Sequence, residues 1–234
     1  MKRMILWGLA FSLAAAPALS RDRRDGDGHG NANPSAVVAA EVAFAQLAQE
    51  KGQWTAFRTT ATKDAVMFVP QMAYAQAWLK DRPDPAKAVT WQPHQVWMSC
   101  DGTLAVTRGA WQGPNSTSGY FTTVWQRQKD GKYKWVLDQG EELPMPLDPP
   151  DMIVGKVADC PPGYRPGRGP RPKDFKGNLP PLDPARRSGQ SLDGTLGWDV
   201  TVSPEGARRF TVTMQLEGAR ATVQDLQVEA PAKK

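Results

Sequence analysis

Residues 101–140 read DGTLAVTRGAWQGPNSTSGYFTTVWQRQKDGKYKWVLDQG, and this stretch predicts a run of β-strands. Apolar and polar residues alternate with the period of two that half-buried strands show. The expected strands are 103–111, 119–129 and 132–143, preceded by a similar segment at 89–100. Asp101-Gly102 and Asp130-Gly131 have the composition of tight hairpin turns, so we expect the four strands to form an antiparallel meander.

The residues before this meander predict helices. We expect helices at 35–51, 54–61 and 73–80 and a buried strand at 66–69. Asn33-Pro34 is a good helix start and Gly52 a good helix end. Apolar residues cover a wide face of the first helix, and Glu41 is assigned to its polar remainder. Helices followed by an antiparallel or mixed sheet indicate an α+β domain over 34–143, with the helices packed on one face.

The second half of the chain has a different composition. The segment 144–189 is rich in proline and glycine, with 12 of the 21 prolines between Pro144 and Pro184. It predicts a linker, and its basic part, 160–189, suits an anionic component of a cell envelope. A three-stranded β-meander is expected at 190–229, docked on the first domain or on a second copy of the chain. The last residues, 230–234, are expected to fray.

The first residues have the pattern of a bacterial secretory signal. Lys2 and Arg3 precede a short apolar run, and Ala18-Leu19-Ser20 suits cleavage before Arg21. The run is too short to span a bilayer, so we expect residues 1–20 to be removed, leaving no transmembrane helix. Residues 21–33 predict a flexible leader. These features predict a periplasmic or secreted protein, and export argues against nucleic acid as a partner.

Residues 33–143 resemble the nuclear transport factor 2-like superfamily, in its SnoaL-like and ketosteroid isomerase-like branch. The resemblance rests on diffuse patterns: AEVAFA at 40–45, DAVMFVP at 64–70 and the strand segments at 101–111, 119–127 and 130–140. It implies a cone, in which a curved sheet wraps around helices and encloses one pocket, often in a homodimer. The superfamily includes isomerases, hydrolases and binders without catalysis, so the fold alone does not assign a function.

Three residues are candidates for catalysis. In the ketosteroid isomerase-like relatives a buried carboxylate is the base, and a tyrosine contributes to an oxyanion hole. The resemblance and the strand pattern direct attention to Asp138, His94 and Tyr120. Alternation places Asp138 on the face of Lys134 and Val136, opposite Trp135. The alternative is that Asp138 hydrogen-bonds neighbouring N–H groups and holds the sheet together.

Tryptophans are the best sign of a ligand. Seven of the nine lie between Trp54 and Trp135, and such side chains line pockets for planar or apolar ligands. We expect a pocket lined by Trp54, Phe57, Trp97 and Trp111. The competing interpretation is that these bulky residues fill the core of a small cone.

The two cysteines and two histidines limit the chemistry. They are too few for a metal cluster, and no G-x-S-x-G or phosphate-binding glycine loop is present, so we expect neither metal nor cofactor. In an oxidising compartment Cys100 and Cys160 predict a disulfide; the alternative is two free thiols. The preferred function is binding of a small, partly apolar ligand. The alternatives are an isomerase or hydrolase with the same pocket, and an envelope interaction module acting through the basic segment.

Overall fold

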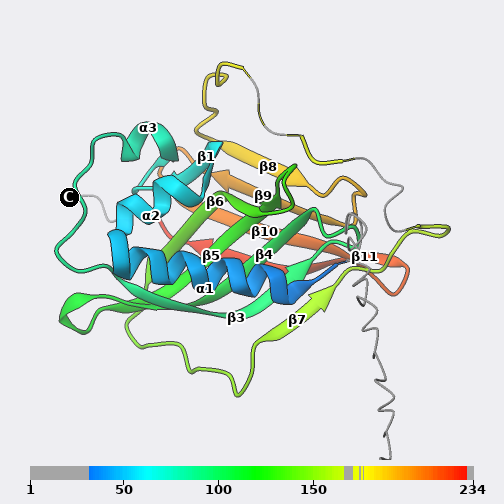
Figure 1. Ribbon diagram of the computed structural model, residues 1–234, viewed down its shortest axis with the longest axis horizontal. Helices are drawn as coiled ribbons and strands as arrows, with labels where there is room; N and C mark the ends of the chain where they lie inside the picture. The colour runs from blue at the N-terminus through cyan, green and yellow to red at the C-terminus, as the bar shows by residue number, and fades with distance from the viewer. Residues whose placement is uncertain (1–31, 166–170, 174, 176, 231–234) are drawn as a thin grey trace, which may run out of the picture.

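The computed structural model describes residues 32–165, 171–173, 175 and 177–230. The predicted signal, nearly all of the leader, part of the basic segment and residues 231–234 lie outside this range. The chain forms two sheets (Figure 1). We call the larger one, with strand order β2-β1-β6-β5-β4-β3-β7, the cone sheet, and the smaller one, with order β11-β10-β9-β8, the second sheet.

Three helices precede or interrupt the cone sheet. They are α1 (Pro34–Lys51), α2 (Gln53–Thr60) and α3 (Ala75–Leu79). The strands of the cone sheet are β1 (Ala61–Phe68), β2 (Met72–Tyr74), β3 (Thr90–Met98), β4 (Leu104–Gln112), β5 (Ser118–Arg127), β6 (Tyr133–Glu142) and β7 (Val154–Val157). The second sheet contains β8 (Arg186–Gln190), β9 (Leu196–Val202), β10 (Arg208–Leu216) and β11 (Ala219–Val228).

The predicted meander is present, and its neighbours complete a mixed sheet. Strands β3 to β6 pair antiparallel in chain order. Strand β1 then pairs parallel with β6, and β7 pairs parallel with β3 at the opposite edge. The α+β class predicted from the sequence agrees with this curved mixed sheet. The class could be predicted because the strand pattern and the hairpin turns are local features of the chain.

Helix α1 starts and ends where its sequence predicts. The side chain of Asn33 accepts a hydrogen bond from the N–H of Ala36, and Pro34 occupies the first turn. Gly52 ends the helix with a φ of 103°, a backbone conformation that favours glycine. The buried residues Val37, Glu41, Phe44 and Ala48 follow one stripe, and this stripe faces the cone sheet.

Two separate cores hold the layers together. Helices α1 and α2 pack on the inner face of the cone sheet around Phe44, Phe57 and Trp135. The second sheet covers the outer face, where Trp97, Val106 and Leu137 meet its apolar side chains (Figure 1). The cone sheet is therefore the middle layer of three.

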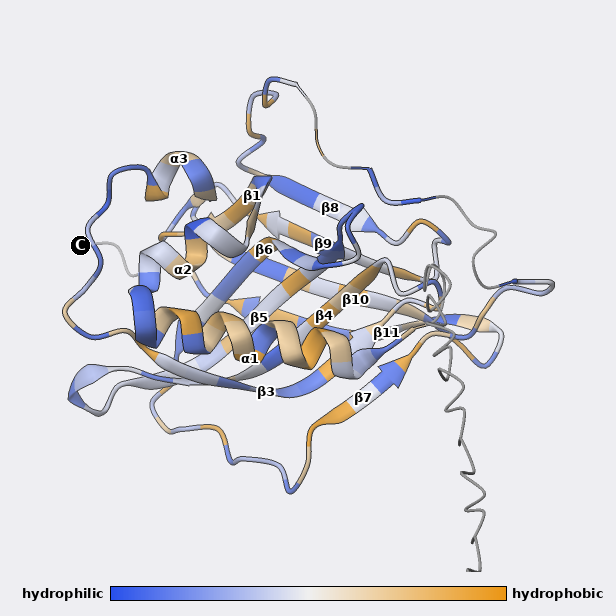
Figure 2. Cartoon of the chain, in the orientation of Figure 1, coloured by the Kyte–Doolittle hydropathy of each residue, from blue (hydrophilic) through white to orange (hydrophobic). Residues whose placement is uncertain are grey.

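The segment 144–229 differs from its prediction. Strand β7 and most of β8 lie inside the predicted linker. Strand β7 extends the cone sheet, and β8 gives the second sheet four strands instead of the three expected. Proline and glycine prevent helix but allow edge strands, and both segments pair at a sheet edge. Figure 2 shows that the chain entering β7 is apolar, and Met152, Ile153 and Val154 are exposed there.

A repeated turn joins the two sheets. Ser99–Leu104 and Ser191–Leu196 share the pattern Ser-x-Asp-Gly-Thr-Leu, and we call them the twin turns. In each, aspartate Oδ1 accepts hydrogen bonds from the serine hydroxyl and from the threonine N–H and hydroxyl. The Oδ2 atoms of Asp101 and Asp193 accept the backbone N–H of each other, at 2.9 and 2.8 Å. The repeat is visible in the sequence.

Replacing Asp193 with asparagine is expected to lower the free energy of unfolding by about 2–4 kcal/mol. The amide would place an NH₂ group among four donors that now meet carboxylate oxygens. Urea denaturation measures the change, with the exposed Asp159→Asn as the control. Because the two carboxylates act as one unit, adding Asp101→Asn should cost less than the sum of the single changes. An unchanged midpoint for Asp193→Asn would contradict this account.

Cys100, which belongs to the first twin turn, forms a disulfide with Cys160, and their Cα atoms are 5.1 Å apart. The bond links the end of the meander's first strand to the chain that follows β7. Among the described residues, none of the helices has the length and apolarity that a membrane span requires.

Candidate functional site

A cavity of about 300 Å³ opens on the inner face of the cone sheet. Its walls are mainly aromatic, with Phe44 and Phe57 from the helices and Trp54, Trp91 and Trp111 around them. Strand β6 supplies the polar part of the wall. Trp54, Phe57 and Trp111 are thus brought together at the cavity, where the sequence analysis placed them.

Asp138 lies in this cavity. Its Oδ2 accepts a hydrogen bond of 2.8 Å from the hydroxyl of Thr123, its cross-strand neighbour. Burial raises the pKa of Asp138 to about 8, and the charge of Glu41 adds to this, although the Thr123 hydrogen bond opposes it. A carboxyl group with this pKa exchanges a proton near neutral pH.

The orientation of Asp138 depends on a β-bulge. Leu137 pairs with Val124, but the next pair joins Trp135 to Trp125, so Val136 is an extra residue. The bulge puts Trp135 in the inner core with Phe57, on the same side as Asp138. Strict alternation, which placed the two on opposite faces, is therefore wrong for Trp135. A bulge redirects side chains in this way, and bulges are frequent beside functional sites.

Glu41 is a second buried carboxyl group, behind the cavity. It is 0% exposed and accepts hydrogen bonds from the indole N–H groups of Trp91 and Trp125, at 2.8 and 2.9 Å. The hydroxyl of Thr107 donates a third, of 2.6 Å. Burial raises the pKa of Glu41, while the three donors lower it in part. The carboxyl group thus fixes α1 to the sheet and sets the position of Trp91.

Glu41 was predicted to lie on the polar face of the helix, and this prediction is wrong because its side chain is buried. The signal was present, because Glu41 lies four residues after Val37 and three before Phe44, on the buried stripe. A charged residue at such a position needs buried partners. The two donor tryptophans lie 50 and 84 residues away in sequence, so only the folded sheet reveals them.

Three predicted site residues lie elsewhere. Trp97 is on the outer face, in the core between the sheets, because it follows the inward-facing Val96 on β3. Tyr120 also faces the second sheet, where burial raises the pKa of its hydroxyl. His94 is the extra residue at a bulge in β3, and burial and the charge of Arg108 lower its pKa. The structure therefore brings neither Tyr120 nor His94 to Asp138.

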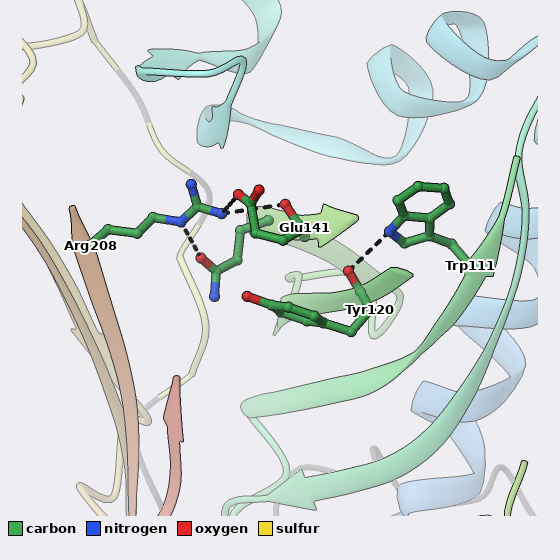
Figure 3. Close-up of polar contacts among 6 residues, drawn as sticks. Trp111, Tyr120, Glu141 and Arg208 are labelled. Carbon is green, nitrogen blue, oxygen red and sulfur yellow. Dashed lines mark hydrogen bonds and ion pairs between the residues drawn. The ribbon is translucent and has the colours of Figure 1, made fainter. Parts of the chain in front are cut away.

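The second sheet holds the wall of the cavity from outside. Arg208 of β10 donates to the side-chain oxygen of Gln139 at 2.9 Å and forms an ion pair with Glu141 (Figure 3). Its guanidinium group also donates to the carbonyl oxygen of Gly140. Gln139, Gly140 and Glu141 directly follow Asp138 and line the cavity. Trp111, on β4, is held by a hydrogen bond from its indole N–H to the carbonyl oxygen of Tyr120 on β5.

Two solved structures are similar to about half of the chain. One, named provisionally as a ketosteroid isomerase from Parabacteroides distasonis, is 14% identical, with a TM-score of 0.39; the match covers 50% of this chain and 97% of that one. The other, named provisionally as an aromatic ring hydroxylase from Novosphingobium aromaticivorans, is 14% identical, with a TM-score of 0.35, and covers 49% of this chain and 91% of that one. Both have the nuclear transport factor 2-like fold. No protein-family model and no curated sequence matches the chain.

Proposed function

We propose that the protein binds one small, flat and largely apolar molecule in the cavity of the cone sheet, with Asp138 as its polar contact. The observation that carries this proposal is the position of one carboxyl group, with a pKa of about 8, in a cavity walled by aromatic rings. At neutral pH this group is largely protonated, so it can donate a hydrogen bond to a carbonyl or hydroxyl oxygen. The rings would supply the apolar contact area.

A second candidate is an isomerase or hydrolase in which Asp138 transfers a proton. The pKa of Asp138 favours it, because a general base works best when its pKa lies near the ambient pH. The lining of the cavity favours binding. Among the described residues that form it, there is no tyrosine, histidine, serine, lysine or arginine, and Glu141, a further carboxyl group of the wall, is paired with Arg208. Binding is therefore the first function to test.

The location of the protein is part of the proposal. The amino-terminal pattern supports export, and the joined cysteines suit an oxidising compartment. The basic segment, 160–189, also supports an anionic component of the cell envelope as a candidate partner. Its Lys173 lies at a groove of about 1060 Å³ with Lys129, Lys132 and Lys134, a charge pattern that suits an anionic polymer.

Tryptophan fluorescence tests the binding proposal with 2-naphthol as the probe. Because Trp54, Trp91 and Trp111 line the cavity, 2-naphthol should quench their emission in a saturable way. Val89→Phe adds bulk to the cavity wall and should weaken binding at least tenfold. The matched control is Val42→Phe, at an exposed position of α1. Equal quenching of both variants, or no saturable quenching of the unmodified protein, would overturn the proposal.

A further inference from the structure

The outer face of the cone sheet carries a row of polar side chains beneath the second sheet. Gln95, Arg108, Thr122 and Gln139 are successive cross-strand neighbours on β3, β4, β5 and β6. We call this set the outer row. It lies directly behind the inner pairs that Thr107, Thr123 and Asp138 form on the other face. The inner side chains have partners, but much of the outer row does not.

The unpartnered atoms of the outer row can all donate hydrogen bonds. Within the described part of the chain, no partner is present for Arg108 Nε, Thr122 Oγ1 or Gln139 Nε2. From the facing second sheet, Gln224 is 5% exposed and its Nε2 also has no partner there. Buried polar groups are hydrogen-bonded in the great majority of cases. A concentration of donors without acceptors between two sheets therefore indicates a site for an acceptor-rich molecule.

The row opens into a cleft between the sheets, which we call the intersheet cleft. Its volume is about 560 Å³, and Gln95, Arg108, Lys156, Thr222 and Gln224 contribute to its walls. The space exceeds that of a single inorganic ion. Three amide or hydroxyl side chains and three charged ones share these walls with five apolar residues, so the cleft can hold a polar organic molecule.

The charges of the intersheet cleft favour an anion. Asp225 also lines it, but both of its carboxylate oxygens accept hydrogen bonds from Arg209, at 2.9 and 2.6 Å. Glu141, near Tyr120, pairs with Arg208. Among the described residues, no carboxylate forms an ion pair with Arg108, whose guanidinium carbon lies 5.5 Å from the centre of the Tyr120 ring. A half-buried guanidinium group without a counter-charge is a preferred contact for a carboxylate or phosphate.

We propose that the intersheet cleft binds a small polar molecule bearing an oxyanion, a carboxylate or a phosphate, which Arg108 holds together with the amide of Gln224. Lys156 at the cleft wall adds a second positive charge. This site is on the opposite face of the sheet from Asp138, and the two sites share none of their lining residues. Its presence also gives the second sheet a role, since Gln224 belongs to β11.

Isothermal titration calorimetry with glucuronate, glucose 6-phosphate and glucose tests the proposal. At least one of the two acids should bind one to one, and neutral glucose should not. Binding of glucuronate alone would identify a carboxylate site, and binding of glucose 6-phosphate alone a phosphate site. Arg108→Gln should weaken binding about tenfold or more, whereas Arg186→Gln, on the exposed side of the second sheet, should not. Failure of both acids to bind, binding of glucose equal to that of the acids, or full affinity in Arg108→Gln would overturn the proposal.

A second variant keeps the test decisive if Arg108→Gln does not fold. Gln224→Met keeps the approximate size of the side chain and removes a buried amide nitrogen at the cleft wall that has no partner among the described residues. Without ligand it should be as stable as the unmodified protein or more stable. With the bound acid present, it should lose much of the ligand-induced rise in Tm. An unchanged rise would contradict the assignment, and Val89→Phe should leave the rise intact because it alters only the cavity.

Discussion

Glu41→Leu is expected to lower the free energy of unfolding by about 3–5 kcal/mol. The substitution fills much of the same volume but leaves the indole N–H groups of Trp91 and Trp125 and the hydroxyl of Thr107 without their acceptor. Each buried donor without a partner costs roughly 1–3 kcal/mol of stability. Part of this sum is offset because the variant no longer has to remove a carboxyl group from water when it folds. Urea denaturation followed by far-ultraviolet circular dichroism measures the change.

Two variants control this prediction. Glu50→Leu makes the same change at an exposed position of the same helix and should have little effect. Glu41→Gln keeps one acceptor oxygen, so its loss should be intermediate. Since the Glu41 charge raises the pKa of Asp138, Glu41→Gln should also lower that pKa. A Glu41→Leu protein as stable as the unmodified one would show that the three donors find other acceptors.

Asp138→Asn is expected to make the protein more stable at alkaline pH. Folding raises the pKa of Asp138 from 3.8 to about 8, so between these values the folded protein binds more protons than the unfolded one. The stability that this group contributes is complete below about pH 4 and is lost as the pH rises through about 8. The variant should therefore match the unmodified protein near pH 4 and exceed it near pH 8, by a few kcal/mol as an order of magnitude.

The measurement is the free energy of unfolding at a series of pH values. Asparagine can still accept the hydrogen bond of Thr123, so the local geometry is preserved. The exposed Asp148→Asn is the matched control and should keep the slope with pH. Part of the slope should remain in Asp138→Asn because burial also raises the pKa of Glu41. A variant that is less stable at every pH would instead assign Asp138 a structural role as an ion.

The strands and the first helix could be predicted because their signals are local. Alternation marks β4, β5 and β6, and Asn33, Pro34 and Gly52 mark the ends of α1. On β6, alternation misplaced Trp135 and Val136, and both errors follow from the bulge at Val136. A bulge depends on how two strands pair, and the alternation of apolar and polar residues in either strand does not specify that pairing.

The candidate site could be predicted only in part. Trp54, Phe57 and Trp111 were predicted as pocket residues because bulky aromatic side chains on adjoining elements tend to meet, and all three line the cavity. Trp97 and Tyr120 were misassigned because a strand pattern gives two faces without saying which one the helices cover. In this protein both faces are buried, one under α1 and one under the second sheet, so burial itself does not distinguish them.

The sequence by itself determined the α+β class, the order of the meander strands, the limits of α1 and the aromatic character of the pocket, because each depends on residues close together in the chain. Only the tertiary structure decided that Asp138 faces the cavity, that Glu41 has three donors and that the second sheet covers the outer row. These features join residues that are distant in the sequence: Thr123 and Asp138 are 15 positions apart, and Glu41 and Trp125 are 84 positions apart. The interaction energies of these contacts depend on the removal of water from both partners when the chain folds, and no local sequence pattern specifies which distant residues will meet.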